Sequence, residues 1–236
     1  MITLIGTGHA FRISEQISFI IKHTWPDAVL VELDERRYAD LMGEPSGGTA
    51  EPPPKLLRKI AKQQNKVREA TIPTTTDDMT TAILAGRSAG AKVICIDKDA
   101  IQTANELEKE MPCLEGTRLS FSFRGGRLFG AKKMEAVQSS IDADEGKYLE
   151  EMHRRFPTFS KKMIDERNVH MAEMIRDASE KYKNIVVVVG DGHVRGICGL
   201  LDGLEIEKIR LADMLDQERM NKVRSRIWNR KAEGSE

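Results

Sequence analysis

The sequence lacks the features that mark secreted and membrane proteins. It has only three cysteines in 236 residues, and Cys95, Cys113 and Cys198 show no CxxC spacing. Such usage favours free thiols in a reducing compartment over a disulfide framework. The longest run of apolar residues, 185–189, has five members, whereas a membrane helix needs about 20. The chain also opens directly on a predicted strand with no charged-then-apolar leader, so we expect a cytoplasmic protein without an integral membrane segment.

An excess of charge of either sign is absent as well. Lys and Arg together number 37, as do Asp and Glu, so the net charge is zero. Proteins that bind nucleic acid through a general basic field carry a clear excess of positive charge. We therefore expect no nucleic-acid partner. The basic stretch 55–68 could contact anionic lipid or RNA, but we interpret it as the solvated side of an amphipathic helix.

The common catalytic signatures are missing too. Residues 6–11 (GTGHAF) lack the third glycine of a dinucleotide-binding fingerprint. The chain contains no GxxxxGK[ST] phosphate loop and no HExxH zinc helix. Any chemistry must therefore rest on another arrangement of residues.

The chain does contain a regular alternation of short apolar strands and helical stretches. We expect strands at 2–5, 28–32, 92–96, 185–189 and 207–211. We expect helices at 13–23, 34–41, 55–69, after 74–78, and at 100–109, 132–155, 159–183, 194–201 and 213–228. Such alternation is typical of an α/β protein with a central, mostly parallel sheet and helices on both faces.

We expect this fold to form a single domain over residues 1–236. Residues 43–54 contain a Gly-Gly pair and a run of three prolines, which predict a flexible loop. Residues 213–236 would form a terminal helix and tail. The glycine- and arginine-rich stretch 116–130 allows no assignment. The amphipathic stretches 132–155 and 213–228 could supply a homodimer surface, or they could be covered within the monomer.

Two copies of a GxxH motif stand directly after apolar strands. The letters GTGH (6–9) follow the first strand, and GDGH (190–193) follow the fourth. In each copy the glycines, including Gly6 and Gly190, let the backbone turn sharply, and a histidine, His9 or His193, comes just past the strand end. Open α/β sheets bind ligands outside the carboxyl ends of their strands. We therefore expect both histidines to line one site.

A single GxxH is a weak signal, because a loop histidine with a satisfied hydrogen bond would explain it. Two copies after two strands favour a functional site. Glu32 ends the second strand, whose other residues are apolar; a solvated residue at a strand end is the alternative interpretation. Two imidazoles and a carboxylate suit a divalent transition metal with open coordination positions.

Three aspartates are further candidates. Asp34 belongs to a charged cluster after Glu32, most of which we interpret as a solvated helix start. Asp78 leads a predicted helix and Asp97 follows the third strand. Helix capping or dipole complementarity explains Asp78 and Asp97 as well as a site role does.

Arg167 and Asn168 fall on the apolar stripe of the predicted helix 159–183. The other members of that stripe are Ile164, Met171, Met174, Ile175 and Ala178. A charged group on a core-facing side is costly unless it is paired. Arg167 therefore either holds a structural carboxylate or lines a site and meets an anion. Glu166 and His170 fall on the opposite, solvent-facing side.

Four segments together resemble the TraB/PrgY (pheromone shutdown) family. Residues 4–41 resemble the pattern GTAH…S…V…PD.V.VELD.RR…L, and 78–103 resemble E/D-M..A…GA.V.LIDRD…T. Residues 155–172 are similar to FP…ERD.YMA, and 188–197 are similar to VVGAGHV.GI. The segments occur in the family's order. The chain departs from the patterns at Gly8, Lys98 and Asn168, where the family favours Ala, Arg and Asp.

The resemblance implies a relationship to the TIKI-type metalloproteases and GumN proteins, and an EreA/ChaN-like fold. In that wider group the first GxxH histidine, a glutamate after the second strand and the second GxxH histidine form the proposed active centre. These positions correspond to His9, Glu32 and His193. The resemblance also implies a site role for Glu166 and Arg167, and it favours Mn²⁺ or Co²⁺ over Zn²⁺. Many members carry carboxy-terminal membrane helices, which we do not expect here.

Together these observations predict a metal-dependent hydrolase that acts on a peptide-like substrate. His9, Glu32 and His193 would hold one divalent ion, and Arg167 would stabilise an oxyanion or hold a substrate carboxylate. Glu166 is a candidate general base. The candidate substrate-contacting or supporting residues are Gly6, Asp34, Asp78, Asp97, Asn168 and Gly190.

Two other functions fit the same residues. The first is metal-independent hydrolysis similar to that of the erythromycin esterases, with His9 as the general base on water and Glu32 orienting it. The second is a non-catalytic protein that sequesters a peptide or another small ligand in the same cleft.

Overall fold

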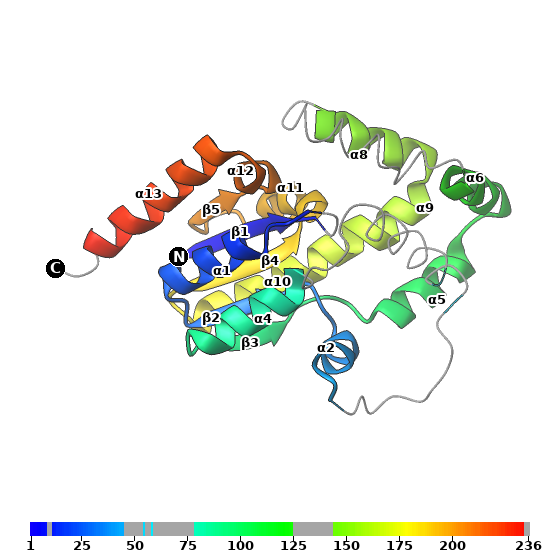
Figure 1. Cartoon of the computed structure of the whole chain (residues 1–236). Coiled ribbons are helices and arrows are strands. Elements are labelled where there is room, and N and C mark those ends of the chain that lie inside the picture. Colours follow the sequence, from blue (N-terminus) through cyan, green and yellow to red (C-terminus); the bar gives the residue numbers. More distant parts are fainter. Residues whose placement is uncertain (9–10, 45–53, 55–57, 59–77, 125–143, 234–236) are drawn as a thin grey trace. The chain divides into compact units, whose positions relative to one another are not determined.

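The computed structural model describes all residues except 9–10, 45–53, 55–57, 59–77, 125–143 and 234–236 (Figure 1). Most of the predicted loop 43–54, most of the predicted helix 55–69 and the first part of the predicted helix 132–155 lie outside the described residues. The chain divides into two compact units. The first comprises Met1–Gly47, Thr74–Asp97 and Asn168–Glu236, and the second comprises Gly48–Pro73 and Lys98–Arg167.

The first unit contains a five-stranded parallel sheet, as the sequence predicted. Its strands are β1 (Ile2–Thr7), β2 (Ala28–Val31), β3 (Lys92–Cys95), β4 (Ile185–Gly190) and β5 (Ile206–Ile209). They lie in the order β3-β2-β4-β1-β5, and every neighbouring pair is parallel. The last strand ends earlier than predicted, because Arg210 caps helix α12 (Leu211–Leu215) through its backbone N–H, which donates to Asp213.

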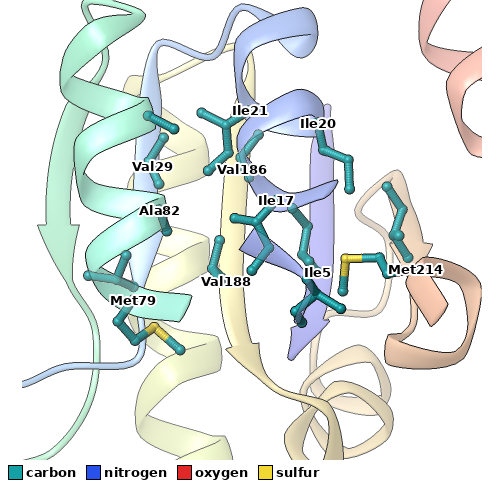
Figure 2. Close-up of a cluster of buried hydrophobic side chains, with 14 of the residues drawn as sticks. Ile5, Ile17, Ile20, Ile21, Val29, Met79, Ala82, Val186, Val188 and Met214 are labelled. Carbon is teal, nitrogen blue, oxygen red and sulfur yellow. The ribbon is translucent and has the colours of Figure 1, made fainter. Parts of the chain in front are cut away.

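One face of the sheet is covered by α1 (Ser14–Thr24), α4 (Asp78–Ser88) and α13 (Gln217–Glu233). Figure 2 shows Ile17 and Ile21 of α1 directed toward Val186 and Val188 of β4. The strands contribute every second residue to this layer, because successive side chains of a strand point to opposite faces. The short side chains of α4, including Ala82, let that helix pack closely on β2.

The opposite face is covered by α11 (Asp191–Leu200) and by the part of α10 (Glu166–Lys181) that belongs to the first unit. Leu4, Leu30 and Val187 alternate onto this face. Parallel sheets are normally covered on both faces, which explains the continuous apolar runs of the strands. Helix α11 begins three residues earlier than predicted, so the second GxxH motif forms the end of β4 and the first turn of α11.

The sheet changes winding direction between β1 and β4. These strands are direct neighbours, with Thr7 in register with Gly190. After β1 the chain enters α1 on one face and continues to β2, whereas after β4 it enters α11 on the other face and continues to β5. Ligands of open α/β sheets bind in the crevice at such a switch point. Both GxxH motifs begin in the last residues of these strands.

The described part of the second unit is helical. It contains α5 (Ala100–Glu110), α6 (Cys113–Arg124), α8 (Asp144–Arg155), α9 (Pro157–Ser160) and a π-helical turn, η1 (Lys161–Asp165). Its small apolar core consists of Leu107, Leu119, Met152, Phe156 and Phe159. Helix α6 occupies much of the stretch that the sequence left unassigned. The predicted helix 159–183 is instead divided into α9, η1 and α10. Among the helices that the structure describes, none is both long and apolar enough to cross a membrane.

Candidate active site

His193 lies in the first turn of α11, directly beyond the carboxyl end of β4. Its side chain is buried, and both ring nitrogens have polar neighbours. Nδ1 is 2.7 Å from Oδ1 of Asn168, which comes from α10. Nε2 is 3.5 Å from Oε1 of Glu32, which follows β2. The fold therefore brings together three of the residues that the sequence selected.

Glu32 reaches this position because it continues β2 by one residue. Its backbone N–H donates to Val188 O at 3.1 Å, so strand pairing extends to this residue. Alternation then places its side chain on the same face as Leu30, the face covered by α10 and α11. The Oε2 atom accepts a hydrogen bond of 2.5 Å from the backbone N–H of Gly190. The carboxylate is thus fixed at the amino-terminal end of α11, where the helix dipole favours negative charge.

Asn168 and Glu32 face the two ring nitrogens of His193 at different distances. Oδ1 of Asn168 can only accept a hydrogen bond, so the 2.7 Å contact is a hydrogen bond when Nδ1 of His193 carries a proton. In the neutral imidazole, Nε2 then presents its lone pair beside Oε1 of Glu32. An imidazole nitrogen and a carboxylate oxygen this close together can bind a cation between them. If Nε2 of His193 takes up a proton, the two groups can instead form an ion pair.

Asn168 is buried on the core-facing side of α10, as the helical wheel predicted. Arg167 and Glu166 belong to the second unit. The guanidinium of Arg167 donates to Met163 O at 3.2 Å. Glu166 forms ion pairs with Lys162 at 3.1 Å and Lys98 at 3.3 Å. Burial raises the pKa of Glu166, but hydrogen bonds from Lys162 and Lys98 more than offset this effect and lower it.

The three candidate aspartates stand at element ends. Asp34 caps α2 (Glu35–Met42), because its side chain accepts the backbone N–H of Arg37 at 2.8 Å. Asp97 follows β3, and its buried carboxylate pairs with Nη1 of Arg37 at 3.1 Å. Asp78 is buried in the first turn of α4. Asp34 is thus a helix cap. Arg37 contacts both aspartates, Asp34 through its backbone N–H and Asp97 through its guanidinium.

Cys95, at the end of β3, is not a ready metal ligand. Burial raises the pKa of its thiol to about 12, and the neighbouring carboxylates Glu35 and Asp34 add to the effect. The thiol therefore stays protonated near neutral pH, and a protonated thiol is a poor ligand and nucleophile.

Sequence reasoning missed the role of Asp191 and Arg210. The Asp191 carboxylate accepts hydrogen bonds from Nε of Arg210 at 2.9 Å, from Nη2 at 2.7 Å and from the backbone N–H of Leu211 at 2.9 Å. It thereby joins the start of α11 to the end of β5. A signal was present, because the second GxxH has Asp191 where the family pattern has alanine.

His9 lies outside the described residues; in sequence it follows the end of β1 by two positions. Within the described part of the chain, no three His, Cys, Asp or Glu side chains form a group that could hold a metal ion. Glu32 and His193 are two side chains of this kind that lie close together. A third metal ligand would have to come from residues outside the described part of the chain.

The fold and this pair define an α/β protein with a candidate ligand site at the carboxyl edge of a parallel sheet. A sequence profile of the TraB/PrgY/gumN family matches residues 1–212, and the chain belongs to that family. The chain is also 26% identical over 220 residues to an uncharacterized protein of Methanocaldococcus jannaschii. That alignment covers 86% of this chain and 54% of the relative, so the chain spans about half the length of the curated relative it matches.

Proposed function

We propose that the protein is a metal-dependent hydrolase of peptide-like substrates, with His9, Glu32 and His193 as the metal ligands. The observation that carries the proposal is the convergence of His193 Nε2 and Glu32 Oε1 at the switch point of the sheet. The other polar atom of each side chain has a contact of its own: Nδ1 of His193 contacts Asn168, and Oε2 of Glu32 accepts from the N–H of Gly190. Side chains that bind metals are commonly oriented by such second contacts.

The spacing of the two atoms fits a shared ion. Ligand atoms about 2.1 Å from one tetrahedral ion lie roughly 3.4 Å from each other. Nε2 of His193 and Oε1 of Glu32 are 3.5 Å apart. Imidazole nitrogen and carboxylate oxygen are ligands that Mn²⁺, Co²⁺ and Zn²⁺ all accept. His9 would be the third ligand, because it follows the strand beside β4 at the same edge of the sheet.

The protein residues would divide the remaining tasks. A bound divalent ion would supply an activated water with a pKa near 7 and a polarised carbonyl. Glu32 contributes negative charge that is held in place by Gly190, and His193 contributes a neutral imidazole. Arg167 would bind an anionic group of the substrate, and Glu166 would be a proton acceptor only after losing its two lysine partners.

One observation also favours a metal-independent hydrolase. A protonated His193 would form an ion pair with Glu32 across the same 3.5 Å, and a histidine beside a carboxylate is a common acid–base pair. The two mechanisms differ in one respect that is easy to measure. Metal removal abolishes activity in the first and leaves it unchanged in the second.

The test is metal binding by protein purified without chelators, followed by peptide hydrolysis. The wild type, His9→Ala, Glu32→Gln and His193→Ala are loaded separately with Mn²⁺, Co²⁺ and Zn²⁺, and bound metal is measured by mass spectrometry. His23→Ala is the matched control, since His23 stacks on Phe19 away from this pair. We expect one ion in the wild type and the control, and its loss in the three variants.

Activity is then measured on a mixture of peptides, with and without the bound metal. Cleavage only with metal supports the proposal. Cleavage that survives complete metal removal supports the acid–base mechanism instead. Peptide that is bound but recovered intact after long incubation with each metal contradicts both mechanisms and supports a sequestering protein.

A further inference from the structure

We propose that Asn168 is a positioning residue that holds His193 in the Nδ1–H tautomer, and that Gly196 provides the space Asn168 needs to do so. The consequence for metal binding rests on the proposed function. The tautomer itself is a property of the metal-free protein, so the two proposals can fail separately.

The contact between Asn168 and His193 is short and shielded. The distance from Oδ1 to Nδ1 is 2.7 Å, and the two residues are only 6% and 8% exposed. Water therefore competes poorly for either group. An unconstrained neutral imidazole exchanges between two tautomers. Here a proton on Nδ1 makes a buried hydrogen bond of 2.7 Å to Oδ1 of Asn168, whereas a proton on Nε2 faces Oε1 of Glu32 at 3.5 Å and leaves Oδ1 of Asn168 facing a lone pair. The shorter contact favours the tautomer with the proton on Nδ1.

Gly196 lies one helical turn after His193 on the same side of α11. A Cβ atom at this position would lie 2.2 Å from Nδ2 and 3.0 Å from Cγ of Asn168. Any other residue would therefore push the Asn168 amide away from its place. Glycine is a poor helix former, yet it stands in the middle of this helix. The close approach of the amide explains why.

The contact could instead serve only to satisfy a buried amide. In that case the loss of Asn168 would change stability, while the tautomer of His193 and its affinity for metal would not depend on the amide. Stability measurements alone cannot separate these roles, so the test reads the imidazole directly.

The first experiment measures the tautomer of His193 by ¹⁵N NMR in the metal-free protein, at a pH where the imidazole is neutral. We compare the wild type with Asn168→Ala, Asn168→Asp and Gly196→Ala. We expect the Nδ1–H form in the wild type, its loss or mixing with the Nε2–H form in Asn168→Ala and Gly196→Ala, and its recovery in Asn168→Asp, whose carboxylate also accepts from Nδ1.

Gly199→Ala is the matched control for Gly196→Ala. Both substitutions add one methyl group to α11, but a Cβ at Gly199 has no atom within 4 Å. We expect the control to keep the wild-type tautomer. If Asn168→Ala does not fold, Gly196→Ala still tests the proposal, because this variant keeps both Asn168 and His193. An Nε2–H form in the wild type, or an unchanged Nδ1–H form in both disruptive variants, overturns the proposal.

The second experiment measures the affinity for Mn²⁺, Co²⁺ and Zn²⁺ by competition with a chelating dye. Loss of a residue that orients a metal-ligating histidine typically weakens binding about 10–100-fold. We expect this loss in Asn168→Ala and Gly196→Ala, and near-wild-type affinity in Asn168→Asp and Gly199→Ala. If the wild type binds the metal and both disruptive variants match it, the positioning role is wrong and the proposed function survives. If the wild type binds no metal but shows the fixed tautomer, the proposed function is wrong and the positioning role survives.

Discussion

Gly6 and Asp191 approach each other so closely that no side chain fits between them. A Cβ atom at Gly6 would lie 2.0 Å from Oδ1 of Asp191. The sequence suggested Gly6 as a residue that lets the chain turn, but the residue lies within β1, and its function is to leave space. The Asp191 carboxylate fills that space and connects to Arg210 and to the start of α12.

Gly6→Ala should therefore destabilise the protein. The added methyl group must displace Asp191, and such overpacking typically costs about 1–3 kcal/mol. The free energy of unfolding in urea measures the loss, and Gly199→Ala, with no atom within 4 Å of its new Cβ, is the control. Equal stability of the two variants would show that Asp191 can move at no cost.

The pairing of Asp191 with Arg210 predicts that lysine cannot replace this arginine. Nε and Nη2 of Arg210 donate to the two oxygens of Asp191 at 2.9 and 2.7 Å, and both side chains are largely buried. A lysine keeps the charge but cannot make two parallel hydrogen bonds. We expect Arg210→Lys to lower the free energy of unfolding by about 1–2 kcal/mol.

The control for this prediction is Arg226→Lys. Arg226 approaches Glu207 at 3.4 Å but is more than half exposed, and exposed ion pairs contribute little. A loss at Arg226 as large as that at Arg210 would mean that the general charge of the region, and not the paired geometry, provides the stability.

The sequence located the groups of the site that come from strand ends, and it missed those that depend on distant contacts. His193 and Glu32 follow apolar strands, so their positions in the chain already placed them at one edge of the sheet. Asn168 was found because it interrupts an apolar stripe. Asp191 was missed as a structural residue because its partner Arg210 lies on a different element, and nothing in the local sequence connects the two.

Lys162 shows a second reason for failure. It precedes Met171 by nine residues, which on a regular α-helix places it about 180° from the buried stripe. The structure nevertheless buries Lys162, because Glu106 and Glu110 of α5 lie around its ammonium group together with Glu166. A wheel drawn on one predicted helix cannot show partners that come from another helix.

Lys162 is the centre of an ion-pair network in the second unit. Its Nζ atom lies 2.9 Å from Glu110, 3.1 Å from Glu166 and 3.4 Å from Glu106. Hydrogen bonds, first that with Glu110, raise the pKa of Lys162. The pKa of Glu166 is lowered, because hydrogen bonds from Lys162 and Lys98 more than offset the opposing effect of burial.

Lys162→Met should therefore destabilise the protein near neutral pH, by about 1–2 kcal/mol. A carboxylate with a lowered pKa contributes stability above its ordinary pKa of 4.5, and the contribution is lost as the pH falls through the folded value. The difference between variant and wild type should thus shrink as the pH falls from about 5 to about 3. The free energy of unfolding in urea, measured for both proteins across this pH range, gives the difference.

Lys98→Met is the control for the network, since Lys98 pairs with Glu166 at 3.3 Å and its side chain is a quarter exposed. We expect a smaller loss with the same dependence on pH. A loss for Lys162→Met that stays constant down to pH 3 would contradict the ion-pair account and indicate that the packing of the aliphatic chain dominates.

The same network gives a test for Glu166 as a proton acceptor. Its two lysine partners hold it in the charged form, and a general base must give up such partners or share them with the substrate. If Glu166 acts only in the network, Glu166→Gln should lose at least as much stability as Lys98→Met, because it removes the charge that both lysines contact, while hydrolysis keeps its rate. A fall in kcat of about 100-fold or more, without a matching loss of stability, would instead give Glu166 the catalytic role.

His153 should titrate above an ordinary histidine because of Asp165. Nε2 lies 2.9 Å from Oδ1 of Asp165, and Nδ1 lies 2.8 Å from Leu149 O. Burial lowers the pKa of His153, but the hydrogen bonds to Leu149 and Asp165 and the charge of Asp165 together raise it. Asp165→Asn removes that charge, so the midpoint of the His153 titration, followed by NMR, should fall.

The direction of the accompanying change in stability follows from the raised pKa. A histidine whose pKa is higher in the folded protein contributes stability below its ordinary pKa of 6.5, and loses it as the pH rises through the folded value. Asp165→Asn should therefore destabilise the protein more at about pH 5.5 than at about pH 8.5. Glu151→Gln, which removes a charge paired with Arg155 on the same helix, is the control. If Glu151→Gln moved the His153 midpoint as far as Asp165→Asn does, the general field of α8 would set this pKa, because the direct partner would then have no effect of its own.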